Sequence, residues 1–284
     1  HGAYESQADA RTILEANVHF LPNGTIPTEE TGARHRTAER LAVETQKPVV
    51  AVSEGRRVAT LFYDGKKVEL AQPTEVAAHV NQDLQSLDRL RARLDDSESR
   101  LTRLEVTGMV TYRHAVTVIQ RAEMVERLGR LVASRAATLG DEGRVVAVQL
   151  NDLLLGVDHT MRLVLLDYLR PLRSGSVEKA LDTLDTLTPS DLEDPSRVGK
   201  ELGFPDLDDP AEPRGHRILS KVARLPESVR EEIVRDFGSV AKLMAADESD
   251  FLRVEGVGET RARQLKAFFD RLHSSAQEWE AILD

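Results

Sequence analysis

The pattern of apolar and polar positions changes near residue 73 of this 284-residue chain. Before that point, short apolar runs alternate with polar stretches. The continuous run Val49–Ser53 is typical of a buried strand. The runs Val58–Tyr63 and 67–70 flank Asp64-Gly65, a dipeptide that favours a tight β-hairpin. These runs predict a mixed α/β domain at the start of the chain.

One more strand and one helix complete the predicted N-terminal domain, which covers residues 1–72. Residues 11–18 are a predicted strand. Residues 37–45 are a predicted short helix, with Thr37 in its first turn. Pro73 then ends the domain, because a proline interrupts the element that precedes it.

Apolar residues after Pro73 recur with a helical period. Thr74 can cap the helix, and charged residues separate the apolar positions. Arg91 and Glu98 fall on the same stripe, so the sequence predicts a long amphipathic helix rather than a perfect coiled coil. The apolar positions, spaced by threes, fours and sevens, are Val80, Leu84, Leu87, Leu94 and Leu101.

Further helices are predicted up to residue 205, which makes residues 73–205 an all-helical spine. Residues 140–143 are a predicted turn within it. Nothing in this stretch indicates catalysis, and its charged faces are interpreted as solvated. The other predicted helices cover residues 106–137, 145–154, 160–168 and 177–187.

The C-terminal part is a predicted all-helical domain that follows a linker. Residues 206–214 are acidic and contain two prolines, which is typical of a linker. In the domain over residues 215–284, one helix stops and another starts at residues 236–239. Short helices are predicted over 246–251 and 260–272, on either side of a glycine-bearing turn.

Composition narrows the class of protein without naming a reaction. Hydrophobic residues make up 40% of the chain and aromatic residues only 4%, so the cores must consist mainly of Leu, Val and Ala. The chain has no cysteine and therefore no disulfide or thiolate metal site. It shows no signal peptide and no apolar run of membrane length, so we expect a cytoplasmic protein that does not bind membranes. The net charge of −10 argues against DNA coating along the whole chain, so any DNA contact must be local.

The richest candidate chemistry lies in residues 28–40, which read T-E-E-T-G-A-R-H-R-T-A-E-R. Two arginines flank a histidine in Arg34-His35-Arg36, and guanidinium groups bind phosphate oxygens in pairs. Gly32 allows the backbone to approach a ligand, and the helix start at Thr37 favours an anion. The pattern alone is equally compatible with a solvated charged turn and an ordinary helix cap, because short basic motifs are common.

A second motif, Val254-Glu255-Gly256-Val257-Gly258, separates two predicted C-terminal helices. Its two glycines permit a tight turn whose N–H groups point outward, and the next helix adds its positive dipole end. Such a turn can hold a DNA phosphate without reading bases, while Val257 would fix it to the core. A simple glycine-rich turn between helices is the alternative, since cations and anions are almost equal in number in this domain. The cations that could contact a neighbouring phosphate are Arg261, Arg263 and Lys266.

The stretch from Gly32 to Arg40, G-x-R-H-R-T-A-E-R, resembles the signature of the diadenylate cyclase domain. Residues 16–22, 26–32 and 48–53 resemble neighbouring segments of that domain. The C-terminal glycine turn resembles the helix-hairpin-helix element. Over nearly its whole length the chain is therefore similar to the DNA integrity scanning family, DisA, in which a cyclase domain, a helical linker and a helix-hairpin-helix domain follow one another.

This resemblance implies an enzyme that condenses two ATP molecules to cyclic di-AMP, releases pyrophosphate and binds branched or damaged DNA. It also implies Mg²⁺ or Mn²⁺ as cofactor and a homo-oligomer, an octamer in the family, because two cyclase domains face each other at each site. Arg34 and His35 are the implied catalytic residues, with a hydrogen-bonded structural histidine as the alternative for His35. Ser53 would face the ligand if the strands are parallel neighbours. The implied ATP- and phosphate-binding residues are Gly2, Phe20, Gly32, Arg36, Thr37 and Ser53.

Position 1 departs from the family pattern. The family carries Asp-Gly-Ala upstream of its basic motif, with further cyclase sequence before it, and this chain has His1-Gly2-Ala3 at that spacing. A neutral imidazole supplies no hard carboxylate oxygen to Mg²⁺, so the metal ligands stay unassigned. Two hypotheses follow. One is a diadenylate cyclase coupled to DNA binding, with His1 at a catalytic position; the other is a catalytically impaired homologue or fragment that acts as a DNA- or nucleotide-binding module.

Overall fold

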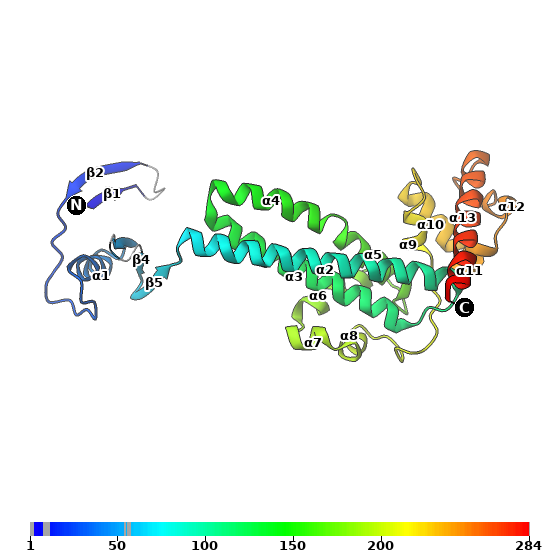
Figure 1. Ribbon diagram of the computed structural model, residues 1–284, viewed down its shortest axis with the longest axis horizontal. Coiled ribbons are helices and arrows are strands. Elements are labelled where there is room, and N and C mark those ends of the chain that lie inside the picture. Colours follow the sequence, from blue (N-terminus) through cyan, green and yellow to red (C-terminus); the bar gives the residue numbers. More distant parts are fainter. Residues whose placement is uncertain (1–2, 8–11, 54, 56–57, 284) are drawn as a thin grey trace. The chain divides into compact units, whose positions relative to one another are not determined.

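Strands in the described chain occur only near the N-terminus, and helices follow from residue 73 onward. The chain divides into two compact units, His1–His79 and Val80–Asp284. The predicted fold class, an α/β domain followed by all-helical parts, is confirmed. A computed structural model (Figure 1) describes residues 3–7, 12–53, 55 and 58–283.

Short strands form two separate antiparallel sheets in the first unit. The first two strands pair with each other, and the other three form one sheet in chain order. Neighbours in the larger sheet are also neighbours along the chain, so short turns suffice to connect them. The strands are β1 (Ala3–Ser6), β2 (Ile13–Val18), β3 (Val49–Ser53), β4 (Val58–Tyr63) and β5 (Lys66–Leu70).

Asp64 and Gly65 connect β4 to β5, as predicted. Both have positive φ, 52° and 67°, which is the geometry of a type I′ turn and matches the twist of the flanking strands. Ser53 ends β3 and is the antiparallel partner of Val58 in β4. Its predicted approach to the ligand depended on parallel neighbouring strands, and the described sheets contain no parallel pair.

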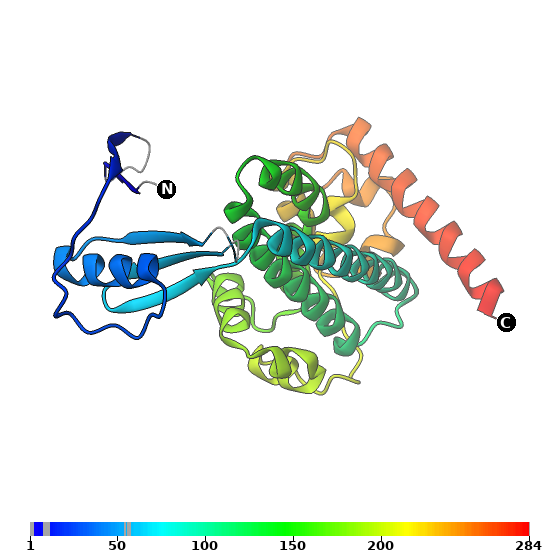
Figure 2. The same ribbon diagram turned by 60° about the vertical axis from the view of Figure 1, so that its left-hand side comes forward.

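One helix, α1 (Ala33–Thr45), covers one face of the three-stranded sheet (Figure 2). Ala38 and Ala42 of the helix are buried against Ala51 and Phe62 of the sheet. The small alanines let the helix axis come close to the strands, while Phe62 supplies most of the apolar surface. This cluster is the interior of the first unit.

The opposite face of the same sheet is aliphatic and exposed. Val50 and Val52 of β3 are 54% and 61% exposed, and Val68 and Leu70 of β5 are also open to solvent. The prediction that residues 49–53 form a strand is confirmed. The prediction that this strand is buried is wrong for Val50 and Val52, since no element among the described residues covers this face of the sheet.

Helix α1 begins four residues earlier than predicted. Gly32, not Thr37, is next to the first turn, because it is the N-cap and its carbonyl accepts from the N–H of Arg36 at 2.9 Å. His35 is buried three residues before Ala38, so the inward-facing stripe of the helix already includes the first turn. The basic motif therefore lies within the helix rather than in a loop ahead of it.

The spine helices of the second unit follow the predicted period. All five apolar positions predicted on α2 (Pro73–Thr107) are buried. Two predicted boundaries are wrong. The helix expected over 106–137 is broken after α2 at Gly108, which has a φ of 72°, and the turn expected over 140–143 is mostly the first turn of a helix that begins at Asp141. The other spine helices are α3 (Tyr112–Ala136), the short 3₁₀ helix η1 (Ala137–Leu139), α4 (Asp141–Leu154), α5 (Val157–Tyr168), α6 (Ser176–Thr186), α7 (Pro189–Glu193) and α8 (Pro195–Glu201).

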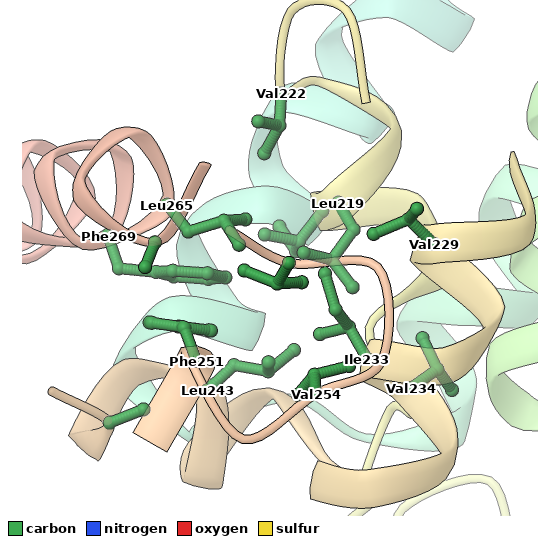
Figure 3. Packing of buried hydrophobic residues seen from close by; sticks show 14 of the residues in the cluster. Leu219, Val222, Val229, Ile233, Val234, Leu243, Phe251, Val254, Leu265 and Phe269 are labelled. Carbon is green, nitrogen blue, oxygen red and sulfur yellow. The ribbon is translucent and has the colours of Figure 1, made fainter. Parts of the chain in front are cut away.

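The C-terminal helices pack around one apolar core (Figure 3). Phe251 and Phe269 stack within it, with ring centroids 5.8 Å apart. The predicted stop and restart is confirmed: Gly238, with a φ of 72°, ends one helix, and the Ser239 side chain caps the next. The helices are α9 (His216–Ser220), α10 (Glu227–Phe237), α11 (Val240–Ala245), α12 (Glu248–Phe251) and α13 (Glu259–Leu283), of which α12 starts two residues later than predicted.

Residues 206–214, predicted to be a linker, pack against the start of α3. Leu207 and Ala211 are buried, and the Leu207 carbonyl accepts from the N–H of Arg113 at 2.7 Å. The Arg113 guanidinium donates to both carboxylate oxygens of Asp208, at 2.7 and 2.8 Å. The stretch therefore leads from the spine to the C-terminal helices as an ordered segment.

A buried set of charged and polar side chains, here called the buried joint, fixes the C-terminal helices to the spine. It consists of Glu105 on α2, Asp167 and Tyr168 on α5, and Arg217 on α9. Glu105 and Arg217 form an ion pair whose side chains are 0% and 3% exposed, and the Tyr168 hydroxyl donates to Glu105 at 2.7 Å. Asp167 accepts from three successive N–H groups at the start of α9, at 2.8, 2.7 and 3.0 Å. Burial raises the pKa of the Glu105 and Asp167 carboxyls. The hydrogen bonds and the ion pair therefore offset the free-energy cost of burying these charges.

Candidate functional site

The loop before α1 is tied to the helix by hydrogen bonds. Four polar side chains of the helix reach back to this loop, and three of them bind backbone groups that lack a partner in secondary structure. The loop is thereby held along α1 next to the basic motif. The pairs are Arg36 with the carbonyls of Glu30 and Thr31 (3.4 Å each), Glu39 with the Thr28 hydroxyl, Arg40 with the Ile26 carbonyl (2.8 Å) and Glu44 with the Asn23 N–H (3.0 Å).

The three residues of the basic motif have different environments. Arg34 is exposed and makes no hydrogen bond or ion pair with any described residue, so its guanidinium is available for an anion. Arg36 is also exposed, but its guanidinium lies against loop carbonyls. His35 is 5% exposed, and its ring meets Phe62 edge-on with centroids 6.2 Å apart. The catalytic interpretation of His35 and its structural alternative both stay predictions.

The topology brings Gly32 and Ser53 to the same end of the first unit. Only residues 46–48 separate α1 from β3, and the two elements pack together, so they run in opposite directions. The end of β3 therefore lies near the start of α1, where the first N–H groups of the helix precede its intrahelical bonds. Thr37 and Phe20 are half-buried, Thr37 in the second turn of α1 and Phe20 after β2. The predicted site residues His1 and Gly2 lie outside the described residues.

A site for Mg²⁺ or Mn²⁺ was tested against the side chains present. The described residues contain no group of three or more His, Asp or Glu that could hold a metal ion. Divalent cations of this kind are bound through carboxylate oxygens together with substrate phosphates.

The glycine turn before α13 leaves a set of backbone donors open. Gly256 has a φ of 81°, which only glycine adopts without strain, and Val257 is 7% exposed within the C-terminal core. The Gly258 carbonyl accepts the first i to i−4 bond of α13, at 2.9 Å. The N–H groups of residues 259–261 come before that bond and point along the positive end of the helix dipole.

Cations next to this turn are not equally available. Arg261 makes no ion pair with any described residue and lies directly on the turn. Arg263 and Lys266 are paired with carboxylates. A cation that already has a carboxylate partner contributes less to an external phosphate, because that partner must be displaced or shared. The contacts are Arg261 to the Gly256 carbonyl (2.7 Å), Arg263 to Glu248 (3.8 Å) and Glu259 (3.9 Å), and Lys266 to Asp270 (2.9 Å).

Similarity to known proteins extends over both units. Residues 7–67 match the family model described as DisA bacterial checkpoint controller nucleotide-binding, and residues 70–209 match the DisA bacterial checkpoint controller linker region. The chain is 41% identical over 282 residues to a DNA integrity scanning protein DisA of Acidothermus cellulolyticus, a match that covers 97% of the chain and 76% of that relative. The chain belongs to the DisA family. DisA proteins of Streptomyces coelicolor and Kineococcus radiotolerans are 40% and 39% identical to it, with 97% of the chain and 75% and 78% of the relatives covered.

DisA membership assigns nucleotide binding to the first unit. The nucleotide-binding match includes the loop, α1 and most of the three-stranded sheet, and therefore all of the basic motif. At the level of the family, the chain has the role of a diadenylate cyclase, a nucleotidyltransferase. The helices in the described part of this DisA-family chain are all too short or too polar to cross a membrane.

Sequence reasoning missed the buried joint of this DisA-family chain. Asp167 looks like an ordinary charged residue of a predicted helix and Arg217 like one of the predicted C-terminal domain, and Arg217 lies 112 positions from Glu105 along the chain. One signal was present: Glu105 follows Leu101 by four residues and therefore continues the apolar stripe of α2. A carboxylate on a buried stripe requires a buried partner, although the pattern alone does not say which residue that partner is.

Proposed function

We propose that this chain is a diadenylate cyclase that makes cyclic di-AMP from two ATP molecules and that its C-terminal turn binds branched DNA, which would keep the protein at the nucleoid. The observation that supports the enzymatic part most is the available guanidinium of Arg34. It lies in the first turn of α1, beside Gly32, within the stretch that matches the family's nucleotide-binding model. Helix start, glycine and free cation together suit a triphosphate.

The proposed reaction joins two nucleotides through their 3′-oxygens and α-phosphates, with pyrophosphate as the leaving group. The 3′-hydroxyl oxygen of each ATP attacks the α-phosphorus of the other, the bond from that phosphorus to the β-phosphate oxygen breaks, and each hydroxyl loses its proton. Two ATP molecules thus give one cyclic di-AMP and two pyrophosphates. Because each nucleotide is attacked by the other, two nucleotide-binding units must meet, so the proposal includes a homo-oligomer, an octamer by resemblance to the family.

In this proposal the phosphate groups are held at the start of α1. Arg34 contacts the triphosphate directly, and Arg36 fixes the loop through its bonds to the Glu30 and Thr31 carbonyls. His35 supports the first turn of α1 from inside, against Phe62. The remaining proposed ligand contacts are Gly2 at the ribose, Phe20 at the adenine, and Gly32, Thr37 and Ser53 at the phosphates, with His1 near the reacting hydroxyl. Mg²⁺ or Mn²⁺ would accompany the ATP phosphates and neutralise their charge.

Cyclic di-AMP formation tests the enzymatic half directly. The protein is incubated with ATP and either Mg²⁺ or Mn²⁺, and the product is measured by mass spectrometry for the unchanged chain, His1→Asp and Arg34→Ala. We expect cyclic di-AMP from the unchanged chain, more from His1→Asp, and at least a hundredfold less from Arg34→Ala, because a guanidinium on a transferring phosphate contributes several kcal/mol, ~3 or more. Arg144→Ala, which changes an exposed arginine of α4, is the matched control and should keep full activity.

The outcome also separates the enzyme from a binding module. Absence of product from both the unchanged chain and His1→Asp would overturn the cyclase proposal. In that case ATP binding, measured by equilibrium dialysis, would distinguish a nucleotide-binding homologue without turnover from a first unit that serves only assembly. ATP binding that is lost in Arg34→Ala but kept in Arg144→Ala would support the nucleotide-binding homologue.

For DNA, the free N–H groups at the start of α13 support contact with backbone phosphate rather than with bases. Gly258 is the position to change, because a side chain there meets nothing within 4 Å and no positive φ is involved. Gly256 is less suitable, because its φ is 81° and a Cβ would come within 3.1 Å of Val229. A Gly256→Asp, Gly258→Asp double variant therefore would not leave the turn intact.

Gly258→Asp should weaken binding to branched DNA at least tenfold, because it adds a negative charge where the phosphate would sit. Gly258→Ala fills the same space without charge and should bind almost as the unchanged protein does. Fluorescence anisotropy with a labelled four-way junction measures both, and circular dichroism checks the helices. Equal binding by the Asp and Ala variants would remove the turn from the DNA proposal.

A further inference from the structure

The outward side of α2 carries a row of arginines, here called the arginine face: Arg89, Arg93, Arg100 and Arg103. Together with Asp96, which lies between the two pairs, these positions follow one another at steps of three or four residues, so they form a single stripe along the helix. All of them are exposed. The stripe lies opposite the buried leucines that hold α2 against the rest of the spine.

The arginines of the arginine face have no carboxylate partner among the described residues. Among the described residues, none of its four arginines takes part in an ion pair; Arg89 donates only to the Ser86 hydroxyl, at 2.9 Å. Arg91, on the leucine-bearing side of the same helix, is paired with Asp95 at 2.9 Å. The guanidinium groups of the arginine face are therefore available to bind an external anion.

A solvated helix face is the simple alternative, and two observations argue against it as the whole explanation. The chain has 48 acidic and 38 basic residues, so a stripe with four arginines and one aspartate runs against its composition. Like charges three or four residues apart also destabilise a helix slightly, and both Arg89–Arg93 and Arg100–Arg103 have this spacing. A surface that only needed solubility would be better served by mixed charges.

The arginine face ends where the C-terminal helices are fixed to α2. Val106 of α2 packs against their apolar core, and Glu105 is buried against Arg217. Lys221, at the start of the segment between α9 and α10, donates to the Thr102 hydroxyl at 3.0 Å. Thr102 is adjacent in sequence to Arg103, so the row of arginines begins beside the domain that carries the glycine turn and extends away from it along the spine.

We propose that the arginine face is a second DNA contact, a track for the phosphate backbone of a duplex arm that leaves the C-terminal domain. This inference rests on the proposed DNA binding by the glycine turn. Arg89 and Arg103 are 14 residues apart on a helix, about 21 Å, which corresponds to about six base-pair steps along the duplex axis at a rise of about 3.4 Å each. Guanidinium groups at this spacing neutralise backbone phosphates without reading sequence, so the track recognises a polyanionic duplex of any sequence.

Neutralising the arginine face while keeping the helix tests the track. The variant Arg93→Gln, Arg100→Gln, Arg103→Gln is compared with Arg144→Gln, Arg173→Gln, Arg197→Gln, which removes the same charge from exposed arginines on α4, before α6 and on α8. Glutamine preserves helix propensity, and circular dichroism checks the fold. Binding is measured by anisotropy with junctions whose arms are short or are extended by about ten base pairs, over a range of salt concentrations.

With long arms, the first variant should bind at least tenfold more weakly than the control, and the slope of log affinity against log salt should fall by about 2 to 3, because about 0.9 counterions are released per phosphate contact. With short arms the two variants should bind alike. Equal affinity and equal salt slope with long arms would overturn the track. That result together with lost binding in Gly258→Asp would leave the glycine turn as the DNA site, whereas unchanged binding in Gly258→Asp would overturn the proposed DNA binding by the turn, on which the track rests.

Discussion

At the scale of single residues, burial separates charges that hold the fold from charges that face a ligand. Arg217 and Glu105 are almost wholly shielded and satisfy one another, with Thr102 accepting from Arg217 at 2.9 Å. Arg34 is exposed and makes no hydrogen bond or ion pair with any described residue. The same residue type therefore serves packing in one place and recognition in another, and the local environment decides which.

Breaking the buried joint on one side should cost far more than replacing it. Arg217→Met leaves the Glu105 carboxylate buried without a cation, so we expect a loss of about 3–5 kcal/mol in the free energy of unfolding, measured by urea denaturation. The double variant Arg217→Met, Glu105→Leu removes both charges and should recover at least half of that loss. Arg162→Met breaks an exposed pair with Asp158 and should cost less than about 1 kcal/mol. A single Arg217→Met variant as stable as Arg162→Met would contradict the importance of the joint.

His216 should make stability depend on pH in a mildly acidic window. Burial, with Arg230 and Arg214 nearby, lowers the pKa of His216 to about 4, whereas an unfolded histidine titrates near about 6.5. The unfolded chain therefore binds more protons between these values, so stability is lost as pH falls from about 6.5 towards about 4. The side chain is partly exposed, so we expect a loss of about 1–2 kcal/mol. Urea denaturation between pH 5 and 7 should show a flatter dependence in His216→Gln, whereas the exposed control His159→Gln should match the unchanged protein; identical slopes in all three would refute this role.

At the scale of elements, the sequence predicted what depends on local period and turn chemistry. The apolar stripe of α2, the Asp64-Gly65 turn and the restart at Gly238 all follow from residues close together in the chain. It did not predict what depends on distant partners. In the first turn of α1, His35 packs on Phe62, and the buried joint pairs residues 50 to 112 positions apart. The basic motif of the candidate site was predictable from sequence, but which of its cations is free was not.

Hydrogen bonds from α1 should control the order of the loop before it. Arg40→Ala removes the 2.8 Å bond to the Ile26 carbonyl, and we expect amide hydrogen exchange in residues 22–31 to rise severalfold while the helix itself stays protected. Arg34→Ala, on the same helix, removes an exposed side chain with no described partner and should leave the loop unchanged. Hydrogen exchange followed by mass spectrometry resolves the two, and equal protection in both variants would show that the loop is held by other contacts.

At the scale of the whole chain, the two units differ in the size of their apolar interiors. The core of the first unit consists of Ala38, Ala42, Ala51 and Phe62 with Val49 beside them, and one face of its sheet is exposed. The C-terminal helices alone bury a much larger cluster that includes Phe251 and Phe269. Since buried apolar area sets most of the favourable free energy, the first unit should open at lower denaturant concentration than the second.

This difference lets the two proposed ligands be assigned to their units in one experiment on the intact chain. A ligand stabilises only the unit that binds it, by about 2.7 kcal/mol when it is present at a hundred times its Kd. ATP should therefore raise the denaturant midpoint for amides of residues 33–70 and leave those of residues 216–269 unchanged, and branched DNA should do the reverse. Segment-resolved hydrogen exchange in urea measures both. Phe62→Ala, which removes the largest side chain from the first core and should cost about 3–5 kcal/mol, ought to abolish the ATP effect and preserve the DNA effect. Stabilisation of the C-terminal helices by ATP, or of the first unit by DNA, would mean that the ligands do not act on the units to which their chemistry assigns them.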